Sequence, residues 1–324
     1  MCKLKKTGFL YLMLLMSSLA LNACSTEDEL ILEDQPNQEE ESETSAQIVK
    51  EVMMSAGDIL SGNSQSRTSL ELADDKLVFA WAENDKIGVF PSEGTQIAFT
   101  IKKGAGKNTA GFDGGAWALR ETETYAAYYP YDVNNTDRSN AELRFCYEGQ
   151  HQTGNASLAH LGKYDLMATN ATSSEDGKLN FKFDHLNSVA QIRLTMPVAV
   201  SVLAMTIKCN EAVFTNVANL DLSGTAYSYS SHEMTNQLQL KLTDVATTEK
   251  NKEVICYMML PPVDLSGKTV DVVLHSDNDR VYQGQLPSKN LKAGFAYTMS
   301  SSMRDVTVSS TVTAPDFGDK DTEY

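Results

Sequence analysis

The sequence of 324 residues contains 43 acidic side chains and 27 lysines and arginines, so its formal net charge is −16 at pH 7. Such a chain repels nucleic acids, whose phosphates are neutralised by lysine and arginine in the proteins that bind them. We therefore predict no nucleic-acid partner, and the length is enough for two modest domains or one large one.

Residues 1–23 have the organisation of a secretory signal peptide. Three lysines precede the apolar run "GFLYLMLLM", which is too short to span a bilayer. Leu21, Ala23 and Cys24 then resemble a bacterial lipobox, so we expect cleavage between Ala23 and Cys24. A diacylglycerol and an acyl chain on Cys24 would anchor the chain stably in a membrane. The alternative is an ordinary signal peptide followed by a chance cysteine.

Residues 24–45 are strongly acidic, and none of them is basic. A segment of this composition cannot bury a core, so we predict a lipidated, disordered acidic tether. Acidic residues directly after a lipidated cysteine also resemble the surface-export signal of some Gram-negative lipoproteins. A plain solvated spacer is the alternative.

From residue 46 onward, apolar residues recur in short alternating runs, a pattern typical of β-strands. The first run, residues 47–54, places Ile48, Val52 and Met54 on one face. Gly, Asn, Asp, Ser or Pro separates nearly all of the later runs, and long helical patterns are few. We therefore predict an all-β fold built of β-sandwiches.

A polar stretch at residues 169–178, "TNATSSEDGK", interrupts the strand pattern. We place a domain boundary there. The prediction is an N-terminal β-sandwich domain, residues 46–177, and a C-terminal β-sandwich domain, residues 178–324.

Few residue patterns in the globular part indicate chemistry. The five histidines show neither HExxH nor HxH spacing, and "KKGAGKNTAG" lacks the first glycine of a phosphate loop. His185 is expected to be a structural histidine that bonds a turn. Cys209 and Cys256 are expected to be small buried hydrophobes, with a disulfide between them as the alternative. We predict no enzyme activity, no metal site, and no cofactor apart from the covalent lipid on Cys24.

Four sequence blocks, in order, resemble the fimbrillin family of outer-membrane lipoproteins. They are "RTSLELADDKLVFAWAENDKIGVFP", "TYAAYYPYD", "DLMAT" with "FKFDHLNSVAQIRL", and "LKAGFAYTM". Asn84 stands where glycine is common in the family, and asparagine also tolerates turn geometry. The resemblance implies two tandem transthyretin-like β-sandwich domains. It also implies a subunit of type V fimbriae that is exported as a lipoprotein.

The family resemblance further implies assembly by strand exchange. An arginine-specific protease cuts after the first strand, which leaves a groove that a strand of another subunit fills. The expected leaving strand carries Ile48, Val52 and Met54 in residues 47–54, with an extension toward Leu60. The expected cut lies between Arg67 and Thr68, because Arg67 is the first arginine of the chain. An uncut loop at this position is the alternative.

A candidate donor strand lies near the C-terminus, in "DVTVSSTVT". Its face consists of Val306, Val308 and Val312. The alternative, a last strand that pairs inside its own domain, stays open.

The predicted function is therefore a fimbrial subunit at the outer membrane and cell surface that contributes to adhesion. Its partners would be other fimbrial subunits, the outer membrane through the lipid anchor, and a host or bacterial surface ligand. The alternatives are a fimbrial anchor or tip protein, and a monomeric surface lipoprotein that binds glycans or host proteins. Four tyrosines could serve such binding if they face outward rather than into the core: Tyr125, Tyr128, Tyr129 and Tyr131. A secreted hydrolase is the weakest hypothesis.

Overall fold

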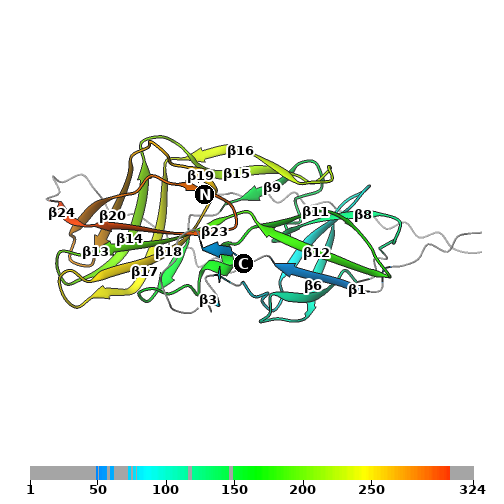
Figure 1. The fold of residues 1–324 in the computed structure, drawn as a ribbon, viewed down its shortest axis with the longest axis horizontal. Coiled ribbons are helices and arrows are strands. Elements are labelled where there is room, and N and C mark those ends of the chain that lie inside the picture. The colour runs from blue at the N-terminus through cyan, green and yellow to red at the C-terminus, as the bar shows by residue number, and fades with distance from the viewer. Residues whose placement is uncertain are drawn as a thin grey trace, which may run out of the picture. The chain divides into compact units, whose positions relative to one another are not determined.

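The structure is a computed structural model that describes residues 49, 51–56, 59–61, 72–73, 76–77, 79–115, 119–145 and 149–306. All of these residues belong to one compact unit, Ser45–Tyr324 (Figure 1). The other unit, Met1–Thr44, lies outside the described residues. So do the predicted cleavage and lipidation site at Ala23 and Cys24 and the acidic tether.

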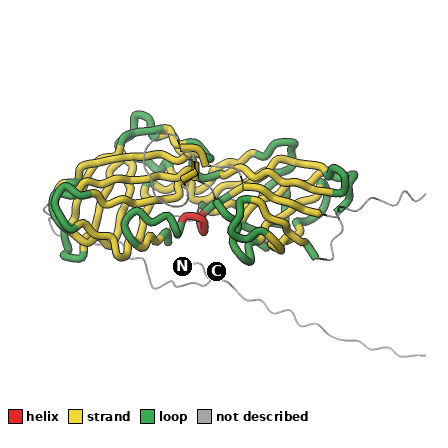
Figure 2. The backbone as a smooth tube through the Cα atoms, turned by 60° about the horizontal axis from the view of Figure 1, so that its bottom comes forward, coloured by secondary structure: helices red, strands yellow, loops and turns green. Residues whose placement is uncertain are grey.

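The described residues form strands, turns and one short 3-10 helix, η1 (Leu161–Tyr164), with no α-helix among them (Figure 2). The prediction of an all-β fold is thereby confirmed. The strands arise from the alternating sequence pattern: along Lys178–His185, every second side chain is buried. No helix in the described part of the chain has the length and apolar character needed to cross a membrane.

Seven strands form a closed barrel. In order around it they are β1 (Glu51–Ala56), β12 (Lys178–His185), β11 (Met167–Ser173), β8 (Thr124–Tyr129), β5 (Lys86–Pro91), β6 (Ile97–Lys103) and β7 (Thr109–Asp113). This part of the chain was predicted to be a β-sandwich, but it is a closed barrel because β1 pairs with β12 on one side and with β7 on the other. Met54, Trp81, Phe99, Phe181 and other buried apolar side chains form one core cluster for this region.

The rest of the fold is built around two six-stranded sheets. The first contains β10 (His151–Thr153), β17 (Gln237–Thr247), β14 (Val200–Cys209), β20 (Val270–Ser276), β21 (Val281–Leu286) and β24 (Arg304–Val306), in that order. The second contains β18 (Glu253–Leu260), β13 (Ser188–Thr195), β23 (Phe295–Ser302), β2 (Ile59–Ser61), β4 (Lys76–Leu77) and β3 (Leu72–Ala73). Side chains from both sheets share one core cluster, as expected of a sandwich.

Two small sheets complete the fold. One contains β16 (Ser228–Thr235), β15 (Phe214–Asp221) and β9 (Ala141–Arg144), and the other contains β19 (Val263–Asp264) and β22 (Asn290–Leu291). Cys209 and Cys256 are both buried and free, in different sheets, so the disulfide alternative is not realised. Burial raises the pKa of the Cys256 thiol to about 12, which suits an inert core residue.

The domain boundary predicted at residues 177 and 178 falls inside the barrel. It lies in the turn between β11 and β12, where Asp176 and Gly177 have φ angles of 51° and 74°. These two strands pair with each other, Met167 opposite His185. The chain passes from the barrel to the next sheet between His185 and Ser188. The division into two domains therefore stays a proposal, with residues 186–187 as the connection that the topology favours.

Candidate functional site

The first two strands belong to two different sheets, and each is paired with a neighbouring strand on both edges. β1 lies parallel to β12, with Val52 opposite Leu179, and antiparallel to β7, with Met54 opposite Ala110. β2 lies parallel to β23 and antiparallel to β4, with Ile59 opposite Leu77. One short segment of the chain thus completes the barrel and also joins β23 to β4 in the second sheet (Figure 1).

The side chains of β1 alternate between the barrel interior and the outside. Val52, Met54 and Ala56 are buried, and Met54 has no exposed surface. Ile48, the remaining apolar residue named for the predicted leaving strand, lies outside the described residues. Ile59 in β2 is also fully buried, in a separate apolar cluster with Leu77 and Phe79. The segment is therefore held by apolar contacts at alternate positions.

Backbone bonds continue beyond the regular pairing of β1. The Val49 N–H donates to the Leu119 carbonyl at 2.9 Å, and the Ala56 N–H donates to the Asn108 carbonyl at 3.0 Å. On the outer face, Lys103 Nζ lies 2.8 Å from a Glu51 carboxylate oxygen. That hydrogen bond and the lysine charge lower the pKa of Glu51. The ion pair is exposed, so it adds little to the stability of the strand.

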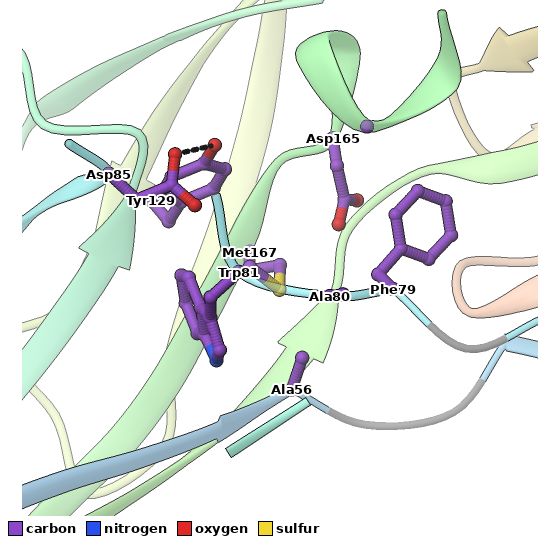
Figure 3. A pocket seen from close by; sticks show the side chains of 9 residues that line it. Ala56, Phe79, Ala80, Trp81, Asp85, Tyr129, Asp165 and Met167 are labelled. Carbon is purple, nitrogen blue, oxygen red and sulfur yellow. Dashed lines mark hydrogen bonds between the residues drawn. The ribbon is translucent and has the colours of Figure 1, made fainter. Parts of the chain in front are cut away.

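A small cavity of about 30 Å³ lies at the end of β1. Ala56, Phe79, Trp81, Tyr129 and Asp165 are among the residues that line it (Figure 3). The volume is enough for a water molecule. Removal of β1 would take away one wall, because Ala56 is part of the strand.

Two carboxylates face this cavity. Asp85 accepts a hydrogen bond from the Tyr129 hydroxyl at 3.0 Å, and burial raises the pKa of Asp85. Burial and the nearby Asp85 charge raise the pKa of Tyr129. Asp165 is buried, and its Oδ2 lies 2.7 Å from Nδ1 of His185. Its Oδ1 has no hydrogen-bond partner among the described residues. A water molecule in the cavity would donate a hydrogen bond to this oxygen.

His185 was expected to be a structural histidine that bonds a turn. It is buried, its Nδ1 lies 2.7 Å from Oδ2 of Asp165 directly after η1, and its ring lies 5.2 Å from the Phe79 ring, between centroids. The sequence gives no sign of this contact, because Asp165 precedes His185 by twenty residues. Within the described ranges, no group of three or more His, Cys, Asp and Glu side chains could hold a metal ion.

The predicted cleavage position belongs to the connection between β2 and β3. Arg67 and Thr68 lie outside the described residues, in the connection between Ser61 at the end of β2 and Leu72 at the start of β3. The cut would therefore separate β1 and β2 together from the rest of the chain.

The predicted donor strand is described only at its start. Val306 ends β24, where it pairs with Val281 of β21 at the edge of the first six-stranded sheet. Val308 and Val312 lie outside the described residues. The pairing inside its own sheet, left open above, thus extends at least to Val306.

The tyrosine run lies mostly in the core. Tyr125 and Tyr128 are almost completely buried, and the Tyr128 hydroxyl donates to Gln96 at 2.7 Å. Tyr129 and Tyr131 are half-buried. Binding of glycans through this run would therefore have to use Tyr131 and the rim of Tyr129.

Comparison with known proteins matches residues 72–315 to the model of the fimbrillin-like family. No curated protein matches the chain.

Several solved structures are similar in fold. A candidate cell adhesion protein from Bacteroides ovatus is 15% identical, with a TM-score of 0.51, over 79% of this chain and 95% of that chain. A candidate cell adhesion protein from Bacteroides uniformis is 13% identical, with a TM-score of 0.49, over 79% and 97% of the two chains. A fimbrial protein from Bacteroides vulgatus is 13% identical, with a TM-score of 0.42, over 79% and 98%. At such identities the first similarity supports the fold alone.

Proposed function

Because this chain belongs to the fimbrillin-like family, we propose that it is a fimbrial subunit of the cell surface that polymerises by exchange of its first strand. In this proposal the chain reaches the outer membrane as a lipoprotein anchored at Cys24. Its two halves correspond to the tandem transthyretin-like domains that the family resemblance implies. Its role is structural and adhesive, not enzymatic, and its partners are other fimbrial subunits.

The position of β1 and β2 is the observation that carries the proposal. Each strand has a neighbour on both sides, so its loss leaves a slot with unpaired backbone groups on two walls. An incoming strand could then form hydrogen bonds with both walls at once. Such β-strand addition joins two chains through main-chain bonds, while side-chain pockets give selectivity.

The burial of the segment explains why a cut alone would not release it. Met54 and Ile59 are fully buried, and truncation of such a side chain typically costs about 2–5 kcal/mol. A cut after Arg67 would therefore leave the strand seated but no longer covalently attached. A replacement must provide apolar side chains at alternate positions, as the predicted donor strand with Val306, Val308 and Val312 would once Val306 leaves its pairing with Val281.

The test uses the full chain after the leader, with Cys24→Ser to remove the lipid. Treatment with an arginine-specific protease should yield a new N-terminus at Thr68, followed by SDS-resistant ladders. The Arg67→Ala variant is the matched control and should give neither. A clean cut that leaves only monomer would refute polymerisation by this route and would favour an anchor or a stand-alone surface protein.

A further inference from the structure

One long strand edge in the sandwich is covered mainly by side chains instead of a strand, with one main-chain bond, from the Ala156 N–H to the Ile255 carbonyl at 3.0 Å. β18 pairs with β13 along its whole length, and it is the last strand of its sheet on the other side. Seven of its eight residues are apolar. An apolar edge of this length is a typical site for unwanted pairing with another chain.

Two glutamines bond to this edge as a strand would. Gln150 donates from Nε2 to the Met259 carbonyl at 2.8 Å and accepts from the Met259 N–H at 2.9 Å. Gln152 accepts from the Tyr257 N–H at 2.7 Å and donates to the Ile255 carbonyl at 2.9 Å. A side-chain amide has one carbonyl and an N–H donor, like a peptide unit, so each glutamine replaces a backbone partner.

Residues that follow Gln152 in the chain cover the rest of the β18 edge. Asn155 accepts from the Ile255 N–H at 2.7 Å and donates to the Glu253 carbonyl at 3.1 Å. His160 Nε2 lies 3.0 Å from the Tyr257 carbonyl. Because burial lowers the pKa of His160 to about 4, the ring is neutral at pH 7 and Nε2 carries the hydrogen that it donates. We call these four side chains the amide ladder: Gln150, Gln152, Asn155 and His160.

The ladder is anchored independently of β18. The backbone of β10, which carries Gln152, pairs with β17 in the opposite sheet, and the Gln150 carbonyl accepts from the Lys241 N–H. Both glutamine side chains are fully buried. The backbone of this segment thus extends one sheet while its side chains close the other.

The other described sheet edges are short or polar. β3, β10, β19, β22 and β24 contain two or three residues each, and β9 contains four. β16 is longer, but its side chains are mostly exposed and polar, and its pairing with β15 is irregular. Without the ladder, β18 would be the long apolar edge most suited to strand addition.

We propose that the amide ladder closes β18 against a second copy of this chain, so that strand addition is confined to the slot of β1 and β2. The partner kept out is the β18 edge of another molecule, which would pair antiparallel about a two-fold axis. The blocking role concerns the uncut chain and does not depend on cleavage at Arg67. Only the confinement to the slot rests on the proposed function.

The test is the double variant Gln150→Met and Gln152→Met, which retains side-chain length and apolar packing but removes the amides. We expect concentration-dependent dimers in sedimentation velocity without protease. Amide exchange at Tyr257 and Met259 should be about tenfold or more faster than in the parent in dilute samples. It should slow again as dimers form.

The matched control is Gln237→Met with Gln285→Met, which adds two methionines at exposed strand positions and should stay monomeric. A double variant that exchanges faster at Tyr257 and Met259 but stays monomeric at every concentration would overturn the proposal. So would a dimer in which those amides stay unprotected.

If the double variant does not fold, a milder single variant tests the same proposal. Asn155 is exposed, and Asn155→Ala uncovers only the Ile255 N–H and the Glu253 carbonyl. We expect faster exchange at Ile255 and weaker dimerisation than in the double variant. Unchanged exchange, or faster exchange without any dimer, would contradict the proposal.

Discussion

Truncation of Met54 measures how firmly β1 is seated. Met54 has no exposed surface, belongs to the core cluster of the barrel, and lies opposite Phe181 on β12 and Ala110 on β7. Met54→Ala removes three heavy atoms. At about 0.8 kcal/mol for each buried methylene equivalent, the transfer cost is about 2.4 kcal/mol, and the cavity adds to it. We therefore expect a loss of about 3 kcal/mol in the free energy of unfolding.

The matched control is the neighbouring methionine. Met53 is half-buried and points to the other face of the same strand. Met53→Ala should reduce the free energy of unfolding by about 1 kcal/mol or less. Urea unfolding of both variants, followed by tryptophan fluorescence, gives the comparison. Equal losses for the two would refute the placement of Met54 inside the barrel.

The same pair of variants tests how the strand behaves after a cut. If fragment 24–67 stays bound through β1 and β2, a loss of about 3 kcal/mol corresponds to about 100-fold weaker retention. The fragment should then leave the cut Met54→Ala chain readily in gel filtration, while the cut Met53→Ala chain keeps it. Release at the same rate would mean that burial of β1 does not hold the fragment.

Three further predictions concern other parts of the fold. Since burial lowers the pKa of His160 to about 4, the folded chain binds a proton there more weakly than the unfolded chain. The free energy of unfolding should therefore fall by up to about 3 kcal/mol as the pH is lowered from about 6.5 to about 4. The variant His160→Gln should lose this part of the pH dependence. Urea titrations that show the same pH dependence for the variant and the parent would contradict the prediction. Ala156 has a φ of 60°, a conformation that glycine adopts with less strain than alanine. Ala156→Gly should therefore raise the melting temperature, with a gain of about 0.5–1 kcal/mol in the free energy of unfolding. A lower melting temperature than in the parent would contradict backbone strain at this position. Tyr129→Phe removes the hydrogen bond to the half-buried Asp85 and should cost about 1.5–3 kcal/mol in chemical unfolding. A neutral effect would show that water replaces the tyrosine hydroxyl at Asp85.

The strands could be predicted from the sequence because alternation has a local cause. Val52 and Met54 lie on one face wherever the strand pairs, so their shared burial follows from the period of two. The family could be recognised from four blocks, and the family match confirms it. The free, buried state of Cys209 and Cys256 also agrees with their apolar surroundings.

Pairing partners could not be predicted in this way. β1 pairs with β12, more than a hundred residues later, and nothing in either strand specifies the other. The polar stretch at residues 169–178 looked like a linker because hairpin turns and linkers share the same composition. It contains the end of β11 and the turn into β12 instead.

The buried polar contacts could not be predicted from local sequence patterns either. Gln150 and Gln152 resemble exposed strand residues in the sequence, yet both are fully buried against β18. Asp165 and His185 meet because β11 pairs with β12, which places Met167 opposite His185. Such contacts depend on the tertiary arrangement and leave no local periodicity.

The composition of the polymer tests the central claim most directly. Chains cut after Arg67 are separated into monomer and ladder bands, and fragment 24–67 is quantified in each band by mass spectrometry. Exchange of the first strand predicts one fragment for each cut monomer and none in the interior subunits of the ladders. Ladders that retain one fragment for every subunit would contradict strand exchange at the slot of β1 and β2.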